Sequence, residues 1–229
     1  SGVAKGSGMI MPNMATMLSF VATDLKISKS ILNKMLKKVT EKSFNMISVD
    51  GETSTNDASI LIATGKSNVN FNNLNKKEKD YFINELQNMH IQLSKKIIKD
   101  GEGASKFITI KVTKTKTILE AKKIAMSIAK SPLVKTAMFA EDPNWGRILC
   151  AVGNVDTNVK DLSKMEIYIG KFLVFKNNQL HQHYVEKEVK KYLKNKNIDI
   201  SVNYNTGKHS AVVWTSDLTY DYIKINAEY

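Results

Sequence analysis

The stretch NMATMLSFVAT, residues 13–23, places Thr16 between a small alanine and a run of apolar and small residues. The run over 17–23 carries no charge and predicts a buried strand. Thr16 would then stand where this strand begins. It could bury its methyl group there as an ordinary strand residue, or it could serve as a nucleophile. Because threonine is common in strands, this stretch leaves both interpretations open.

A nucleophilic Thr16 needs a base, because a threonine hydroxyl reacts poorly until its proton is removed. The sequence places no His–Asp pair near it. The α-amine of a chain that begins at threonine has an ordinary pKa of about 7.7–8.0, which suits a general base at neutral pH. That amine exists only if the Ala15–Thr16 bond is cut. The hydroxyl can make the cut by attacking the carbonyl of Ala15, which forms an ester that water then opens.

The composition predicts a globular chain in a reducing compartment. With 229 residues and 42% hydrophobic content, the chain can form one large domain or two small ones. Aromatic residues at 8% and only 3 prolines exclude a disordered chain. No apolar run approaches the roughly 20 residues that cross a bilayer, and the opening residues lack the pattern of a secretory signal. A single cysteine, Cys150, favours a cytoplasmic location.

The charge is strongly positive, at +12 from 34 Lys and Arg against 22 Asp and Glu. Most of it is lysine spread along predicted helices, and Arg147 is the single arginine. Aromatic residues do not alternate with the basic ones, as a groove for single-stranded nucleic acid requires. We therefore expect a solvated lysine-rich surface, with neither nucleic acid nor a membrane as partner, and a field that favours acidic small substrates.

Alternating helix and strand patterns predict a layered fold of mixed sheets and helices, of the α/β or α+β class. Apolar spacing and caps predict helices over 30–44, 75–97, 118–130, 148–152 and 183–195. Alternation and β-branched content predict strands over 17–23, 59–65, 107–112, 134–140, 198–205, 210–216 and 220–229, and a hairpin over 165–175. The best candidate for a boundary between lobes lies at 153–163.

Metal chemistry has little support in the sequence. His181 and His183 form the only close pair of histidines, and no other ligand type stands near them at a zinc spacing. His90 lies beside an apolar stripe on a predicted helix, where a structural role is the simpler interpretation. We expect no metal site. Arg147 is either a structural clasp, paired with Glu141 or Asp142 of its own loop, or a functional residue of that loop.

Three polar, glycine-containing stretches are candidates for a binding site. Residues 2–8, GVAKGSG, are either a flexible loop or a close backbone approach in which Lys5 holds a carboxylate. Residues 49–59, VDGETSTNDAS, form either a surface turn or a polar cluster at the end of a strand. Gly101 and Gly103 flank Glu102; a helix C-cap explains the first glycine, and the second leaves Glu102 on accessible backbone.

Five blocks in order along residues 2–229 resemble one family, the bifunctional ornithine acetyltransferase/N-acetylglutamate synthase of arginine biosynthesis. They are GVAKGSGMIMPNMATMLSF, VDGETSTND, DGEGASKF, SPLVKTAMFAEDPNWGRIL and YDYIKINAEY. In that family a precursor cleaves itself between Ala and Thr of an ATML motif. The resemblance implies a cut at Ala15–Thr16, with 1–15 as the tail of an α chain and 16–229 as the β chain. It also implies the layered fold of a self-processing enzyme with an N-terminal threonine nucleophile, the α chain as partner and an α2β2 assembly.

The resemblance also implies the chemistry. Thr16 matches the catalytic nucleophile, while Lys5, Glu102 and Asn226 match substrate-binding positions together with Thr16. The implied reaction is a ping-pong transfer of the acetyl group of N-acetylornithine to glutamate through acetyl-Thr16. No cofactor or metal takes part in it. Acetyl-coenzyme A is a candidate co-substrate, because the family often accepts it as a donor.

Two departures and two alternatives accompany this interpretation. The oxyanion-hole residues of the family lie in the upstream half of the precursor, and the family ends a few residues beyond the position of Tyr229, on a substrate-contacting threonine or serine. An N-terminal-nucleophile aminopeptidase or amidase would share Thr16 but pass the acyl group to water. A non-catalytic, basic binding subunit would need neither cleavage nor Thr16. Within the 16–229 chain, we expect lobes of about 16–153 and 163–229.

Overall fold

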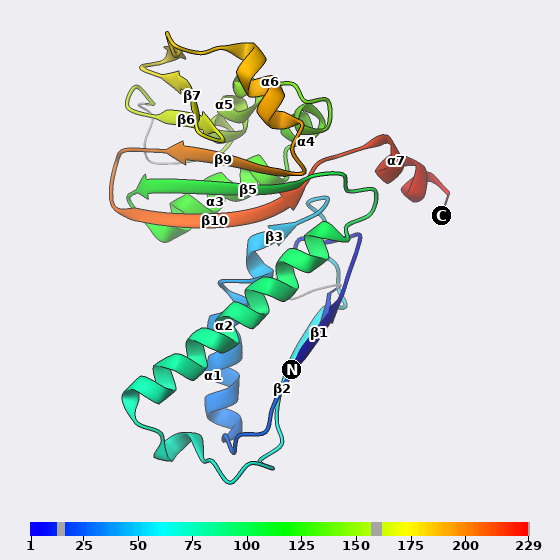
Figure 1. Ribbon diagram of the computed structural model, residues 1–229, viewed down its shortest axis with the longest axis vertical. Helices are drawn as coiled ribbons and strands as arrows, with labels where there is room; N and C mark the ends of the chain where they lie inside the picture. Colours follow the sequence, from blue (N-terminus) through cyan, green and yellow to red (C-terminus); the bar gives the residue numbers. More distant parts are fainter. Residues whose placement is uncertain (13–16, 157–161, 229) are drawn as a thin grey trace.

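The protein combines two sheets with helices packed against them, as Figure 1 shows for a computed structural model that describes residues 1–12, 17–156 and 162–228. A seven-stranded sheet with short helices forms one end of the molecule. A three-stranded sheet and two helices, one of them 24 residues long, extend from it as a second lobe. The expected layered fold of mixed sheets and helices is confirmed.

The three-stranded sheet has the order β1 (Gly2–Lys5), β2 (Leu18–Thr23), β4 (Ala58–Ala63). β1 runs antiparallel to β2, and β4 runs parallel to it. The opening residues were predicted to be a flexible loop or a close backbone approach. Residues 2–5 form an ordered edge strand and not a flexible loop, because β2 supplies partners for their backbone groups, with Val3 opposite Phe20. The close backbone approach occurs just after this strand, at Gly8.

Helices α1 (Lys29–Thr40) and α2 (Lys76–Lys99) pack on one face of this sheet. α2 begins at the predicted capping box, in which Asn75 and Glu78 each bond the other's backbone amide. His90 of α2 is fully buried; its Nδ1 lies 2.7 Å from the carbonyl of Leu86, and its ring meets the edge of Phe44. Burial lowers the pKa of His90, so this side chain is neutral in the core. Short 3₁₀ helices, η1 (Phe44–Met46) and η2 (Phe71–Asn73), lie in the connections.

The seven-stranded sheet is mixed, with the order β3-β10-β5-β9-β6-β7-β8. Its strands are β3 (Ile47–Ser48), β5 (Phe107–Thr115), β6 (Glu166–Ile169), β7 (Phe172–Lys176), β8 (Gln179–Leu180), β9 (Asn197–Asn203) and β10 (His209–Ser216). The predicted hairpin is β6–β7, with Gly170 at a φ of 58° in its turn. β5 pairs with β9, so strands from both sides of the expected boundary at 153–163 belong to this one sheet.

Four helices accompany the seven-stranded sheet: α3 (Ile118–Ala129), α4 (Pro132–Phe139), α5 (Trp145–Gly153) and α6 (Glu186–Leu193). α3 packs directly on β5 and β10, and α5 packs on α3. Thr117 caps α3 by accepting from the amide of Glu120, as the sequence predicted. One continuous hydrophobic core joins the two lobes.

Two predicted strands are wrong, because both segments are helices. Residues 134–139 belong to α4, which Ser131 caps and which Pro132 opens at its first position, and Ala140 is its C-cap. Its buried side chains at 134, 137 and 138 follow helical spacing, not alternation. Residues 220–227 form α7 (Tyr220–Ala227), capped by Thr219, whose Oγ1 accepts from the amide of Tyr222 at 3.2 Å.

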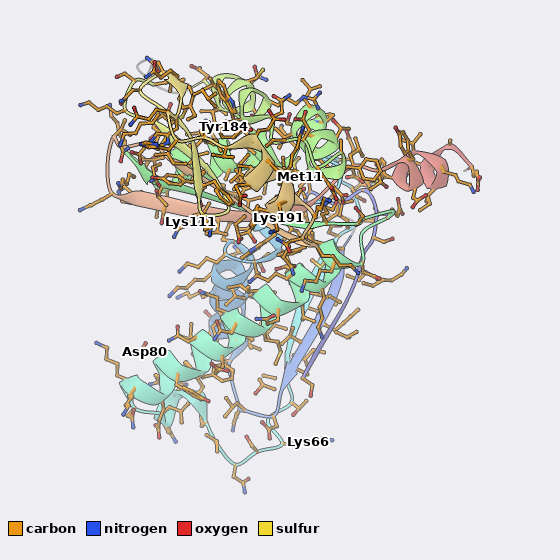
Figure 2. The ribbon with its side chains drawn as sticks, turned by 45° about the horizontal axis from the view of Figure 1, so that its top comes forward. Met11, Lys66, Asp80, Lys111, Tyr184 and Lys191 are labelled. Carbon is orange, nitrogen blue, oxygen red and sulfur yellow. The ribbon has the colours of Figure 1, made fainter. Side chains whose placement is uncertain are left out.

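The two lobes have distinct extremities. Lys66 and Asp80 mark the end of the extended lobe, whereas Lys111, Tyr184 and Lys191 lie at the end with the seven-stranded sheet (Figure 2). α7 projects sideways from that end and carries the C-terminus (Figure 1). Among the described helices, none has the length and apolar character that crossing a membrane requires.

Candidate functional site

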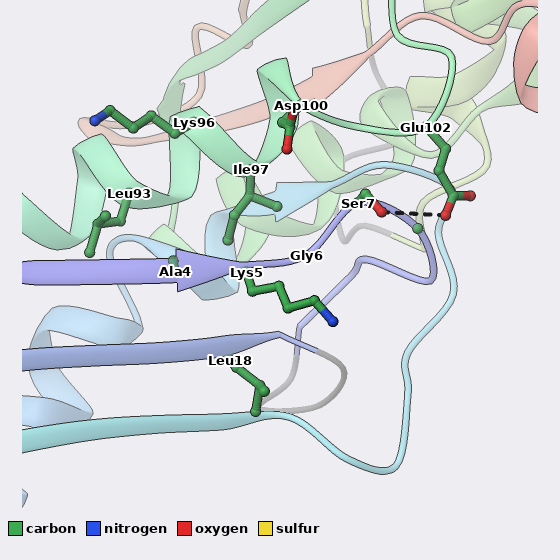
Figure 3. Close-up of a pocket in the computed structure, with 11 residues that line it drawn as sticks. Ala4, Lys5, Gly6, Ser7, Leu18, Leu93, Lys96, Ile97, Asp100 and Glu102 are labelled. Atoms are coloured by element: carbon green, nitrogen blue, oxygen red, sulfur yellow. Dashed lines mark hydrogen bonds between the residues drawn. The ribbon is translucent and has the colours of Figure 1, made fainter.

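A cavity of about 560 Å³ lies where β1 ends, between the C-terminal end of α2 and the start of β2. Its lining includes Lys5, residues 6–8, Leu18 and Glu102. Figure 3 shows Lys5 extending from the end of β1 between Leu18 and the turn at Ser7. This volume is typical of sites for small metabolites. Two lysines, Lys5 and Lys96, and two carboxylates, Asp100 and Glu102, line it.

Glu102 is held against the residues that follow β1. Its backbone amide donates to the carbonyl of Ser7 at 3.0 Å, and its Oε1 accepts from the hydroxyl of Ser7 at 3.4 Å (Figure 3). Gly8 lies so close that an added Cβ would overlap the Glu102 carboxylate. The glycine at position 8 therefore allows the backbone to approach the carboxylate closely.

α7 brings Asn226 to the same carboxylate. The Nδ2 of Asn226 donates to Oε2 of Glu102 at 3.0 Å, across 124 residues of sequence. Gly103 has a φ of 61°, and an added Cβ there would overlap the backbone of Tyr222. Thr219, which caps α7, also donates to the carbonyl of Gly103 at 2.7 Å. The second glycine of the DGEG motif therefore lets α7 pack beside Glu102, which the sequence did not reveal.

The structure thus brings together three of the residues singled out in the sequence. Lys5 and Glu102 line the cavity, and Asn226 contacts Glu102. Ala15 and Thr16 lie outside the described residues. Their neighbours on the C-terminal side place the start of β2 at the cavity: Met17 is fully buried, and Leu18 lines the cavity wall.

Asp57 lies beside the start of β2. Neither of its buried carboxylate oxygens has a hydrogen-bond partner within residues 1–12, 17–156 and 162–228. Burial raises the pKa of Asp57 to about 6, and the backbone of Met17, which faces it without completing a hydrogen bond, acts in the opposite direction. The polar stretch at 49–59 therefore reaches the beginning of this strand, as its position before β4 suggested.

Asp50 is a residue of this region that sequence reasoning missed. Its carboxylate accepts from the backbone amides of Met9 and Ile10 at 2.7 and 3.0 Å, and from the hydroxyl of Tyr222 at 3.3 Å. Burial, followed by the negative charges of Asp50 and Glu102, raises the pKa of Tyr222 to about 12, so its hydroxyl stays protonated. Asp50 lies inside the 49–59 stretch, but no motif or spacing in the sequence distinguishes it from the polar residues that follow.

The remaining candidates lie elsewhere. Arg147 donates through Nη1 to the carbonyl of Leu133 at 2.9 Å and to the hydroxyl of Thr136 at 3.3 Å, so it ties α5 to α4. The rings of His181 and His183 lie 5.5 Å apart. In the described parts of the chain, no three His, Cys, Asp or Glu side chains gather as a metal-ligand group.

Comparison with known proteins places the chain in one family. The sequence profile of the ArgJ family matches residues 1–229. The chain belongs to the ArgJ family. A protein of Colwellia psychrerythraea named "Arginine biosynthesis bifunctional protein ArgJ" is 48% identical over 235 residues, which cover 100% of this chain and 55% of that protein. A protein of the same name from Psychrobacter arcticus is 44% identical, with 100% of this chain and 56% of that protein covered.

A solved structure supports the same assignment. The crystal structure of the arginine biosynthesis bifunctional protein ArgJ from Bacillus halodurans, at 2.00 Å resolution, superposes with a TM-score of 0.87 at 39% identity. The superposition covers 93% of this chain and 100% of the solved chain. This chain spans about half the length of the curated relatives that it matches.

Proposed function

We propose that this ArgJ-family chain is the processed part of a glutamate N-acetyltransferase, which moves the acetyl group of N-acetylornithine to glutamate. The observation that carries the proposal is the cavity at the start of β2, where Lys5 and Glu102 converge and Asn226 contacts Glu102. The relatives' printed name, a bifunctional protein of arginine biosynthesis, supports the pathway. The reaction needs no metal or resident cofactor, and acetyl-coenzyme A is proposed as an alternative acetyl donor.

The first step is self-cleavage at Ala15–Thr16. The Thr16 hydroxyl attacks the carbonyl carbon of Ala15; the C–N bond breaks, an ester forms, and the freed α-amine takes up a proton. Water then opens the ester and leaves residue 15 with a carboxyl group and Thr16 with a free amine.

The second step is acetyl transfer. The Thr16 α-amine accepts the hydroxyl proton while Oγ attacks the acetyl carbonyl of N-acetylornithine. Ornithine leaves with that proton on its amine, and the acetyl group stays on Oγ as an ester. The amine of glutamate then attacks the ester, Oγ regains a proton, and N-acetylglutamate departs. Water in place of glutamate would make the protein an amidase, so the acceptor distinguishes these two readings.

Charge decides how the substrates lie in the cavity. Both amino acids carry an α-carboxylate, and Lys5 supplies the cation at the end of β1. Glu102 supplies the negative charge for the ammonium group of the acetyl donor. The bonds from Ser7 and Asn226 fix the orientation of this carboxylate and leave lone pairs free for the ligand.

The three-stranded sheet supports the proposal of an α chain as partner. The face opposite α1 and α2 exposes a contiguous group of apolar side chains, 38–61% accessible: Val3, Leu18, Phe20, Ile60 and Ile62. Val3, Phe20 and Ile60 stand side by side in the register of the sheet. Apolar faces of this kind mark interfaces. We propose that the upstream half of the precursor covers this face in an α2β2 enzyme of the cytoplasm.

The test uses the precursor with its upstream half and a Thr16→Ala variant, with Thr23→Ala at the far end of β2 as control. Intact mass should show wild type and Thr23→Ala split at Ala15–Thr16, and Thr16→Ala whole. Transfer of acetyl from N-acetylornithine to glutamate should fall at least about a thousandfold in Thr16→Ala and stay near wild type in the control.

Three results would contradict the proposal in different ways. A wild-type precursor that stays in one piece has no free amine at Thr16, which removes the mechanism. Acetate release without N-acetylglutamate indicates an amidase. If wild type and Thr16→Ala have the same mass and bind substrates equally, and neither transfers acetyl, the chain is a binding subunit.

A further inference from the structure

A turn at residues 7–10 lies between two carboxylates, of which only Glu102 lines the cavity. Glu102 holds one side of the turn, through the carbonyl and the hydroxyl of Ser7. Asp50 holds the other side, through the amides of Met9 and Ile10. Lys5 precedes this turn at the end of β1, and Ser7 and Gly8 of the turn line the cavity themselves, so the shape of the cavity depends on how the turn is fixed.

The backbone of the turn is shaped to bind Asp50. Met9 has a φ of 53°, in the left-handed region that residues other than glycine rarely adopt. This conformation points two successive amides toward one anion, the arrangement known as a nest. The two oxygens of Asp50 each take one of these amides. Removing the carboxylate would leave an uncommon backbone conformation without the contacts that compensate for it.

α7 contacts both carboxylates from one face. Tyr222 and Asn226 are four residues apart, so their side chains lie on the same side of the helix. The hydroxyl of Tyr222 donates to Asp50, and the amide of Asn226 donates to Glu102. The turn, the two carboxylates and α7 therefore form one connected network of hydrogen bonds.

We propose that Asp50 is a positioning residue, which fastens the segment ahead of the cleavage site to the loop at 49–53 and to α7. Asp50 acts through the 7–10 turn and Tyr222 and does not touch the substrate. The inference rests on the proposed function, since that function makes the turn part of the α-chain tail. Once the bond at Ala15–Thr16 opens, the tail has no covalent link to the β chain at that point.

Other contacts also hold the tail, so the contribution of Asp50 is limited to the part of the tail that they do not fix. β1 pairs with β2, the carbonyl of Ile10 accepts from Val49, and that of Met11 accepts from Thr53. These bonds fix the two ends of the segment. Asp50 fixes the turn between them. This turn contacts Glu102, which lines the cavity. We therefore expect loss of Asp50 to affect substrate binding more than self-cleavage or folding.

The experiment compares Asp50→Asn with wild type in the full precursor, with Asp24→Asn at an exposed carboxylate as matched control. Asparagine keeps the size of the side chain but replaces one acceptor by a donor, which faces an amide or the Tyr222 hydroxyl. Hydrogen exchange in the peptide covering 5–12 should rise at least about tenfold. KM for glutamate and N-acetylornithine should rise by about tenfold, with kcat within about threefold of wild type. Asp24→Asn should match wild type in each measurement.

A second pair of variants covers the case in which Asp50→Asn does not fold. Tyr222→Phe removes one donor from Asp50 and leaves both backbone amides, and Tyr220→Phe is its control on the exposed side of α7. We expect a rise in KM of a few fold for Tyr222→Phe only, and no further rise when it is combined with Asp50→Asn.

Unchanged exchange in 5–12 together with unchanged KM in Asp50→Asn would overturn the inference and leave Asp50 as the acceptor that closes its own turn at Glu52. Failure of the proposed function gives a different result. In that case the wild type neither splits nor transfers acetyl, while the exchange comparison between Asp50→Asn and Asp24→Asn still decides whether Asp50 fastens the turn.

Discussion

The seven-stranded and three-stranded sheets differ in what covers them. In β5 of the larger sheet, Ile108, Ile110 and Val112 are fully buried under α3 and its neighbours, and polar or charged side chains such as Lys111 occupy the alternate positions. In the smaller sheet, the face packed on α1 and α2 buries Ser19 and Val21, while the other face exposes apolar side chains such as Phe20.

This difference has separate consequences for the folding of this chain and for its binding to other surfaces. An exposed polar face needs nothing further, since water solvates it. An exposed apolar face gains free energy when another surface covers it, at about 25 cal/mol per Å² of buried apolar area. The larger sheet therefore buries its apolar face within this chain, whereas the smaller sheet leaves one apolar face exposed. The cavity lies at the end of the smaller sheet, so the proposed partner would pack beside the site.

The largest expected effect comes from removing a side chain within the larger sheet. Ile110→Ala deletes a fully buried side chain between β9 and β10 and should lower the free energy of unfolding by about 2–5 kcal/mol. Denaturant unfolding measures it, with Ile60→Ala of β4 as the matched control on the exposed face. Equal losses in the two variants would contradict the contrast between the sheets.

An intermediate effect on the free energy of unfolding is expected from replacing Lys135, which is buried beside the end of β10. Its ammonium group donates to the carbonyl of Ser216 and to the hydroxyl of Thr215. Burial lowers the pKa of Lys135 to about 7, and the charges of Asp217 and Asp50 act in the opposite direction. Between about pH 7 and 10.5, the unfolded chain holds a proton that the folded chain lacks, so stability rises with pH in this window.

The measurement is the difference in unfolding free energy between wild type and Lys135→Met at about pH 7 and pH 9. This difference should shift in favour of the wild type by up to about 1.4 kcal/mol per pH unit. A His90→Gln variant serves as control in the smaller lobe: burial lowers the pKa of His90, so its effect lies below 6.5 and leaves the alkaline window unchanged. A difference independent of pH would show that Lys135 keeps its ordinary pKa.

The smallest expected effect on folding comes from the exposed face of the smaller sheet. Phe20→Ser should change the free energy of unfolding of this chain by no more than about 0.5 kcal/mol, because Phe20 is 42% exposed. The same variant should weaken association with the upstream half, measured by mixing separately expressed halves. Strong destabilisation of this chain, with association unchanged, would mean that the face is structural and not an interface.

Local signals in the sequence were enough to predict most helices and strands and to point to some residues of the candidate site. Asn75 and Thr117 cap their helices through residues three positions away, so the signal and its partner stand in the same short stretch. The strand predictions for 134–140 and 220–229 were wrong, because a short apolar run is compatible with a helix as well as with a strand. The cap residues Ser131 and Thr219 distinguish the two, because each accepts a hydrogen bond from a backbone amide three residues later.

By itself, the sequence named candidate residues for the site: its resemblance to a family pointed to Lys5, Thr16, Glu102 and Asn226. Only the tertiary structure decided which of these residues meet, and through what. Asn226 reaches Glu102 across 124 residues, and Asp50 reaches Tyr222 across 172. Nothing local encodes such contacts, since they form only when β1, the end of α2 and α7 have packed. The same packing left one face of the smaller sheet apolar and exposed, because α1 and α2 cover only the other.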